Sequence, residues 1–213
     1  MRLPSPPLLL ITDRHQARGD LPAITAAAFS AGCRWLSLRE KDLPPDEQRA
    51  LIRKLLQLAQ PHRGIVTVHG DPDLAGDAGA HGVHLPSGSD AAAARRLLGP
   101  DALIGVSVHG PDGARAVDPE FADYVIAGPL FETASKPGYG PALGPIGLGS
   151  IVEACAVPVI AIGGIAPDNV ADCCAAGASG VAVMGGVMRA ESPGRMVTQL
   201  LEALRTSRTK FGA

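Results

Sequence analysis

Hydrophobic positions along the chain are grouped into short runs that recur about every 20 to 30 residues. Each run is followed by a polar turn and by a stretch with helical spacing of apolar residues, which is the pattern of a βα repeat. We predict eight strands, at residues 8–12, 35–39, 65–69, 82–85, 103–108, 124–127, 157–162 and 180–184. The helical spacing predicts helices at residues 21–31, 45–59, 90–98, 113–117, 148–154, 167–176 and 193–204.

Eight βα units in a chain of 213 residues match a compact (β/α)8 TIM barrel. Three segments, "SAGCRW", "DAGAHG" and "AAGASG", repeat one arrangement in which a helix end is followed by glycine and a new strand. A doubly wound open sheet is the alternative, but no GxGxxG follows the first strand. The sequence therefore predicts an α/β fold, a single TIM-barrel domain over residues 1–213.

Composition restricts the class of ligand more than it restricts the fold. The chain is 46% hydrophobic with only 3% aromatic residues, so we expect an aliphatic core of the kind that helix-covered parallel strands build. A net charge of −2 without charged blocks favours a small-molecule ligand over nucleic acid.

The N-terminal apolar run is too short for a signal peptide or a membrane span, which predicts a cytoplasmic protein without membrane contact. Whether it forms a homo-oligomer is left open. The four cysteines form no CxxC pair and are expected to be small core residues.

Two pairs of glycines end the last two predicted strands. Gly163 and Gly164 follow strand seven, and Gly185 and Gly186 follow strand eight. In TIM barrels the phosphate site often forms after these two strands, where backbone N–H groups at helix starts can hold an anion. We predict phosphate binding at these four glycines; the alternative is that they only permit tight turns.

The end of the second strand carries alternating polar side chains. Ser37, Arg39 and Lys41 point in one direction along an extended segment and are expected to converge on the barrel axis. An arginine inside a barrel needs an anion or a carboxylate. Arg39 is therefore predicted to meet the ligand, with Asp13 or Glu40 as alternative partners.

Three histidines, His69, His84 and His109, stand near the ends of strands three, four and five. Proton transfer suits them better than zinc binding because they lack the close spacing of zinc ligands. His84 is alternatively a core residue. The long loop at residues 128–144 carries Thr133, Ser135 and Lys136, and is predicted to act as a lid whose lysine faces a phosphorylated substrate, unless that lysine is merely solvated.

Seven segments in order resemble the thiamine phosphate synthase and TenI superfamily. They are "LITDR" at 10–14, "LREK" at 38–41, "GVHL" at 82–85, "GVSVH" at 105–109, "ADYVIAGPLFETASK" at 122–136, "IAIGGI" at 160–165 and "AGASGVAVMGGV" at 176–187. The resemblance implies a TIM barrel that handles a hydroxyethylthiazole phosphate, with the phosphate held by backbone around the two glycine pairs.

The two branches of this superfamily differ in their use of metal. The synthase pattern, which implies Mg²⁺, has Gln, Asn-Asp and Asp where this chain has Ser37, His69-Gly70 and Ser89, and the nearest acids, Asp71 and Asp90, lie one residue later. The segments "LPSGSD" and "FET" resemble the metal-independent TenI branch of thiazole tautomerases. That branch has a histidine after strand six, whereas Pro129 stands here, as in the synthases.

Three hypotheses follow from this mixed pattern. The first is a metal-independent and cofactor-independent thiazole tautomerase, with His109 or His69 transferring the proton and Arg39 holding the substrate carboxylate. The alternative is a thiamine phosphate synthase that uses Mg²⁺, and the third is a non-catalytic binder of phosphate esters. Either enzyme would act on a phosphorylated thiazole. The alternative is supported by the residues that match its substrate-binding pattern, namely Arg39, Lys41, Ser107, Pro129, Thr133, Ser135 and Lys136.

Overall fold

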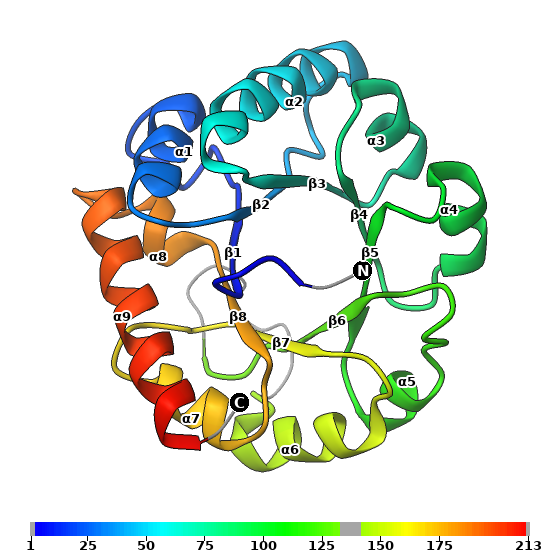
Figure 1. Ribbon diagram of the computed structural model, residues 1–213, viewed down its shortest axis with the longest axis vertical. Helices are drawn as coiled ribbons and strands as arrows, with labels where there is room; N and C mark the ends of the chain where they lie inside the picture. The colour runs from blue at the N-terminus through cyan, green and yellow to red at the C-terminus, as the bar shows by residue number, and fades with distance from the viewer. Residues whose placement is uncertain (1–2, 133–141, 212–213) are drawn as a thin grey trace.

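Eight parallel strands close into a barrel in sequence order, with β8 pairing with β1 (Figure 1). A computed structural model of the chain describes residues 3–132 and 142–211. The strands are β1 Leu8–Ile11, β2 Trp35–Leu38, β3 Ile65–His69, β4 Gly82–Leu85, β5 Leu103–Val108, β6 Tyr124–Ala127, β7 Val159–Ile162 and β8 Gly180–Val183. The predicted TIM barrel is confirmed.

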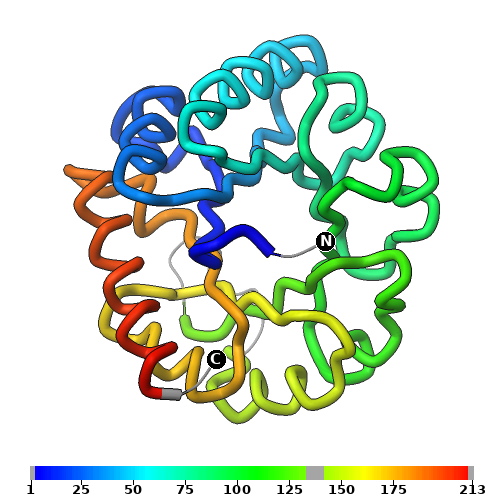
Figure 2. Tube along the Cα trace, in the orientation of Figure 1, coloured from blue at the N-terminus to red at the C-terminus, as the bar shows by residue number. Residues whose placement is uncertain are grey.

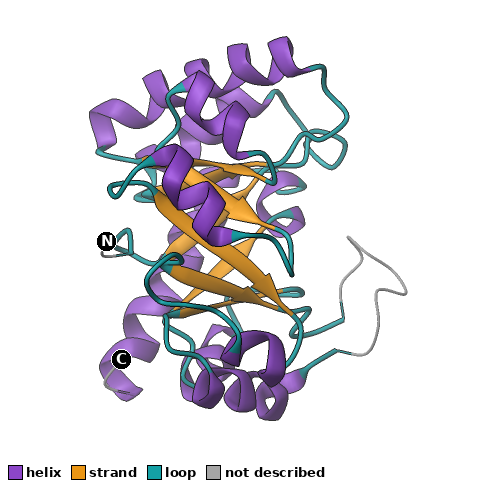
Figure 3. Ribbon diagram, turned by 90° about the vertical axis from the view of Figure 1, so that its right-hand side faces the viewer, coloured by secondary structure: helices purple, strands orange, loops and turns teal. Residues whose placement is uncertain are grey.

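Helices follow the strands and form a ring outside the barrel (Figures 1 and 3). They are α1 Leu21–Ser30, α2 Pro45–Ala59, α3 Pro72–Ala78, α4 Ala91–Leu98, α5 Pro111–Arg115, α6 Gly144–Ala154, α7 Val170–Ala175, α8 Gly185–Met188 and α9 Pro193–Phe211, with a 3-10 turn η1 at Gln60–His62. This arrangement leaves the carboxyl ends of all eight strands at one face, where TIM barrels carry their chemistry.

Four strands have the predicted bounds, and the other four are shorter than predicted. β2 ends before Arg39, whose N–H donates to the side-chain Oγ1 of Thr12 at 2.9 Å instead of to a backbone carbonyl. β7 begins after Pro158, which has no N–H to donate to a ladder. The hydroxyl of Thr12 thus sets the end of β2 and Pro158 the start of β7, which the hydrophobic pattern alone placed one and two residues away.

The helices depart further from the prediction, which gave no helix between β3 and β4 and none directly after β8. α3 is short but capped, because the side chain of Asp71 accepts a hydrogen bond from Leu74 N at 2.9 Å. α7 begins three residues later than predicted. Asn169 holds the preceding loop, since its Oδ1 accepts from Ala166 N and its Nδ2 donates to Gly164 O, each at 2.9 Å.

Buried side chains form two layers on either side of the barrel wall. The larger layer packs between strands and helices and is mainly aliphatic, as the composition predicts, with Phe29 the one aromatic residue among its buried members. The inner layer fills the barrel and includes Leu9, Trp35, Tyr124 and Ile160. Leu3 packs against this inner layer, and the N-terminal segment lies across the barrel in Figure 2. The barrel is therefore filled and closed at the end opposite the strands' carboxyl termini.

Two aromatic side chains fill the middle of the barrel, which the low aromatic content did not suggest. Trp35 and Tyr124 are both fully buried and meet edge to face, with ring centroids 4.7 Å apart. Gly105 makes room for them, since a Cβ at this position would come within 2.5 Å of three ring carbons of Tyr124. The Tyr124 ring in turn stacks against His84, with centroids 5.7 Å apart. This aromatic pair therefore forms the floor beneath the strand ends.

The cysteines are free thiols, and Cys33, Cys173 and Cys174 are buried. Burial raises the pKa of the Cys33 thiol to about 11 and that of Cys173 to about 12, which disfavours the reactive thiolate. Over residues 3–132 and 142–211, no helix combines the length and the apolar character that a bilayer span needs.

Candidate active site

A cavity of about 490 Å³ opens at the carboxyl ends of the strands. This volume suits a small organic ligand. The cavity brings together most of the predicted site residues that the structure describes, namely Arg39, Lys41, His69, Ser107, His109, Gly163, Gly164, Gly185 and Gly186. Thr133, Ser135 and Lys136, together with the rest of residues 133–141 of the predicted lid, lie outside the described residues.

The inward-facing residues divide the cavity floor into a polar half and an apolar half. β3, β4 and β5 contribute His69, His84 and Ser107, whereas β6, β7, β8 and β1 contribute the apolar residues Ile126, Ile162, Ala182 and Ile11. Because side chains on a strand alternate between its faces, one inward residue from each of these seven strands reaches this level. The division is suited to a ligand with a hydrogen-bonding ring at one end and an apolar ring at the other.

His84 is the most deeply placed ionisable group of the cavity, with only 1% of its surface exposed. Its Nε2 lies 2.8 Å from Ser107 Oγ, and its ring centroid lies 5.1 Å from that of His69. Burial lowers the pKa of His84 well below its usual value, and the nearby His69 and Lys41 lower it further. The imidazole is therefore neutral at physiological pH.

The other ring nitrogen of His84 is buried without a partner in the described part of the chain. Nδ1 of His84 has no hydrogen-bond partner among the described residues. A buried polar atom without a partner is costly, and a ligand atom that bonds to it removes that cost. Sequence reasoning left His84 either as an acid or base or as a core residue; the structure makes it a buried residue that also lines the cavity.

Arg39 and Lys41 line the cavity as predicted, although both lie beyond the end of β2. The alternative in which Arg39 pairs with Glu40 or Asp13 is not found, since no such ion pair occurs among the described residues. Ser37 is different: it is fully buried inside the barrel wall and does not line the cavity. The alternation of side chains along β2 predicted correctly that Ser37 points into the barrel, but the cavity does not extend down to Ser37.

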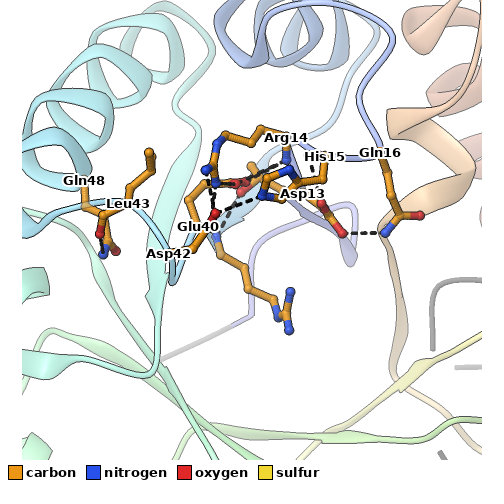
Figure 4. Close-up of polar contacts among 10 residues, drawn as sticks. Asp13, Arg14, His15, Gln16, Glu40, Asp42, Leu43 and Gln48 are labelled. Atoms are coloured by element: carbon orange, nitrogen blue, oxygen red, sulfur yellow. Dashed lines mark hydrogen bonds and ion pairs between the residues drawn. The ribbon is translucent and has the colours of Figure 1, made fainter.

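Glu40 pairs with Arg14, in a cluster that joins the β1–α1 and β2–α2 loops (Figure 4). Arg14 donates to both carboxylate oxygens of Asp42, at 2.6 and 2.5 Å, and His15 Nε2 lies 2.9 Å from Asp42. The Arg14 guanidinium, together with His15, holds the pKa of Asp42 well below its usual range. The contacts of Asp42 are solvent-exposed, whereas the Glu40 carboxylate is buried and also accepts hydrogen bonds from the backbone N–H of Arg14, so Glu40 is the member of the cluster that fixes the two loops together.

His109 is exposed at the cavity rim, and its Nδ1 lies 3.1 Å from the carbonyl oxygen of Gly128. Because a carbonyl can only accept, Nδ1 carries the proton in this contact. His109 is therefore oriented by the backbone directly after β6.

The backbone of residues 129–132 crosses directly over Gly163 and Gly164. Leu130 N donates to Ile162 O at 2.8 Å, and Phe131 N donates to Gly163 O at 3.0 Å. Both glycines have positive φ, and a Cβ on Gly164 would lie 2.6 Å from the carbonyl oxygen of Glu132. These contacts alone require glycine here, so the pair does not by itself indicate phosphate.

At the second pair the prediction needs a correction, because Gly185 and Gly186 form the first turn of the short helix α8 instead of ending β8. Gly186 is exposed, and an added Cβ there would only reach ordinary contact with the carbonyl oxygen of Ile165 at 3.8 Å, while Gly185 is covered by the side chains of Gln16 and Arg189. Arg189 and Glu132 both line the cavity and were missed by the sequence analysis. The sequence contained one indication of Arg189 as a cavity residue, namely a charged side chain three residues after the glycine pair.

A family model described as thiamine monophosphate synthase matches residues 8–187. The chain belongs to the thiamine monophosphate synthase family. It is 42% identical over 205 residues to a protein of Geobacter sulfurreducens provisionally named thiamine-phosphate synthase, covering 95% of this chain and 96% of the relative. It is 39% identical to the thiamine-phosphate synthase of Anaeromyxobacter dehalogenans, over 91% of this chain and 87% of the relative.

A solved structure supports the same assignment. The thiamine phosphate pyrophosphorylase from Pyrococcus furiosus superposes with a TM-score of 0.84 at 29% identity, covering 94% of this chain and 96% of that one. The relatives carry the name that the sequence analysis gave only as the alternative. The tautomerase hypothesis, which was the first choice, receives no support from them.

The strand ends where synthases of this family are expected to hold Mg²⁺ carry histidines in this member. His69 and His84 are register partners on β3 and β4. The nearest acids, Asp71 and Asp90, instead cap α3 and α4, accepting from Leu74 N and Ala93 N at 2.9 Å each. No cluster of three metal-binding side chains occurs in the part of the chain that the structure describes. The described residues therefore do not fit a protein-held Mg²⁺ at this place.

Proposed function

We propose that the protein is a thiamine-phosphate synthase, which joins hydroxymethylpyrimidine diphosphate to hydroxyethylthiazole phosphate and releases diphosphate. The observation that carries the proposal is the cavity itself, lined by Arg39, Lys41 and His84, in a chain whose full-length relatives have synthase names. The cavity belongs to a family member matched over nearly the whole barrel, so the likeness includes all eight strand ends.

The proposed reaction is a substitution at a methylene carbon. The lone pair of the thiazole nitrogen forms a C–N bond to the CH₂ of the pyrimidine, while the C–O bond to diphosphate breaks and its electron pair leaves with the diphosphate. The thiazole nitrogen becomes a quaternary cation, so no proton has to be removed from the nucleophile. A neutral His84 is compatible with this chemistry, whereas tautomerisation depends on proton transfer in the reaction itself.

The charged leaving group must be stabilised as it departs. Arg39 and Lys41 lie beyond β2, and among the described residues that line the cavity the formal cations Arg39, Lys41 and Arg189 face a single carboxylate, Glu132. Positive groups aimed at a developing negative charge in a site shielded from water are an effective source of rate enhancement. We assign the diphosphate to Arg39 and Lys41, and no step of this assignment depends on a metal.

The polar half of the cavity floor suits the pyrimidine. A pyrimidine presents ring nitrogens and an exocyclic amino group, and His84 Nδ1 and Ser107 Oγ are polar atoms that can bond to them. The apolar side chains Ile126, Ile162 and Ala182 suit the flat, sulfur-containing thiazole ring. Placing the two rings on adjacent halves would bring the reacting nitrogen and carbon together, which is the main contribution that a positioning site can make.

Product formation tests the proposal. Purified protein is incubated with both substrates and Mg²⁺, and thiamine phosphate is measured by its oxidation to a fluorescent thiochrome. We expect Lys41→Met to lower kcat/KM by roughly 10-fold or more, because one charge-assisted contact contributes about 1.5–3 kcal/mol. The matched control is Lys54→Met on the exposed surface of α2, which should leave kcat/KM unchanged.

Two results would contradict the proposal. One is the absence of thiamine phosphate under any divalent-metal condition together with aromatisation of carboxythiazole phosphate, which would restore the tautomerase hypothesis. The other is binding of thiazole phosphate with neither reaction, which would favour a non-catalytic binder.

A further inference from the structure

Arg189 lies at the cavity, at a place that the glycine pattern of the sequence does not explain. It follows the short helix α8 directly and lines the cavity beside Gly185. Its guanidinium lies over this glycine, because a Cβ on Gly185 would come within 2.7 Å of Arg189 Cζ. The absence of a side chain at 185 thus leaves the guanidinium room to lie against the backbone at the glycine-lined end of the cavity.

A neutral side chain holds this guanidinium in place. Arg189 Nη1 donates to Gln16 Oε1, and Gln16 Nε2 donates to Asp13 Oδ2 at 2.5 Å, a contact that Figure 4 shows. The same loop is tied to α8 a second time, since Arg18 N donates to Met188 O at 3.0 Å. Because Gln16 carries no charge, its contact orients the guanidinium without offsetting the positive charge.

The surroundings of Arg189 make this end of the cavity suitable for an anion. Gly163, Gly164 and Gly186 line the same cavity as Arg189, and Gly186 is exposed. The cations Arg39 and Lys41 follow β2, whereas Arg189 follows β8, and β1 lies between these two strands in the barrel. The cavity therefore has two separate cationic regions, which matches two anionic substrates bound at the same time.

We propose that Arg189 binds the phosphoryl group of the thiazole substrate and that Gln16 is a positioning residue for it. This assignment rests on the proposed function for the identity of the ligand, but phosphate binding can be measured without any reaction. Its consequence is specificity: a planar guanidinium held in one orientation contributes to binding a phosphate and contributes nothing to binding the corresponding alcohol. Phosphorylated thiazole is thereby selected by a side chain as well as by backbone amides.

Calorimetry with the full chain tests the assignment. The affinities of hydroxyethylthiazole phosphate and of unphosphorylated hydroxyethylthiazole are compared for wild type, Arg189→Gln, Gln16→Leu and the control Arg18→Gln, whose side chain contacts the exposed Glu191. We expect Arg189→Gln to lower the phosphate affinity roughly 10- to 100-fold and to leave the alcohol affinity unchanged. Gln16→Leu should lower the phosphate affinity about 3- to 10-fold, since the guanidinium keeps its charge but loses its orientation.

Gly185→Ala offers a second variant with a separate mechanism. The three atoms nearest to the added methyl group are at the ends of the Gln16 and Arg189 side chains. We therefore expect it to displace the guanidinium with little loss of thermal stability, and to reproduce the selective loss of phosphate affinity.

The assignment is overturned if Arg189→Gln binds the phosphate as tightly as wild type does, or if both ligands lose affinity equally, which would indicate a structural role. Failure of the proposed reaction gives a different result. A wild type that forms no thiamine phosphate but binds thiazole phosphate through Arg189 contradicts the synthase and supports the assignment. If the wild type forms thiamine phosphate and Arg189→Gln has an unchanged KM for thiazole phosphate, the synthase is supported and the assignment of Arg189 is contradicted.

Discussion

Replacement of Gly105 by alanine tests whether the aromatic floor of the barrel is as tightly packed as its geometry indicates. A Cβ at this position would lie within 2.5 Å of three ring carbons of Tyr124, whereas carbon atoms in contact are about 3.5–4.0 Å apart. The ring would have to move by about 1 Å or more. It is fully buried between Trp35 and His84, with centroid distances of 4.7 and 5.7 Å, so it has little room to do so.

The expected cost follows from overpacking of a filled core. Such changes destabilise by about 1–3 kcal/mol. For a domain of this length each kcal/mol corresponds to about 2–4 °C, so Tm should fall by roughly 2 to 12 °C. Gly113→Ala is the matched control: this glycine lies in α5, the helix that follows β5, and an added Cβ there meets nothing within 4 Å. This variant should keep or slightly raise Tm, as alanine favours a helix.

Thermal unfolding followed by circular dichroism gives the Tm of both variants. Chemical denaturation at 25 °C checks that the two variants rank in the same order of stability. Adding Tyr124→Leu to Gly105→Ala should cost less than the sum of the two single changes, because the smaller side chain removes the overlap. An unchanged Tm for Gly105→Ala would refute the reasoning, as would strictly additive effects in the double variant.

Three further predictions concern the site. The pKa of His84 is lowered from 6.5 in the folded state, so below pH 6.5 the unfolded chain binds a proton that the folded protein excludes. The free energy of unfolding should therefore fall as the pH drops below 6.5, by up to about 1.4 kcal/mol per pH unit. Urea unfolding at pH 5 and pH 7 measures this loss, and His84→Gln should lack it. Asp90→Asn should keep both the α4 cap and most of the synthase activity, while Asp90→Ala loses about 1 kcal/mol; abolished activity in the Asn variant would instead make Asp90 a ligand of metal or substrate. Gly164→Ala should lower Tm, because of its positive φ and the carbonyl of Glu132 nearby, and Gly186→Ala should not; equal Tm values would contradict this account of the two glycine pairs.

Local pattern was sufficient for the strands and for the direction of their side chains. Apolar runs and intervening turns placed all eight strands, four of them to the residue, because burial on both faces makes a parallel strand apolar throughout. The short helix α3 was missed because two aspartates and a glycine dilute its apolar pattern. The cap and the packing of α3 stabilise it, and neither can be recognised from the spacing of apolar residues.

Motif reasoning was weakest where one residue type serves two purposes. Gly163 and Gly164 were assigned to phosphate, yet a neighbouring loop crosses them closely enough to require glycine without any ligand. The missing carboxylates favoured a tautomerase, whereas the comparisons favour the synthase. The net charge of the site depends on residues that lie far apart in the sequence. The absence of two acidic residues therefore did not show which reaction the remaining cations could assist.

By itself the sequence determined the barrel, its family, and which side chains stand at the strand ends, because each of these depends on spacing along a single strand or turn. Tertiary structure decided the rest. It buried His84 beside Ser107, placed Ser37 below the cavity, directed Glu40 to Arg14, and set Arg189 over Gly185 against a glutamine 173 residues away in the chain. Closure of the barrel brings β8 beside β1, and only that closure makes neighbours of residues that no local pattern connects.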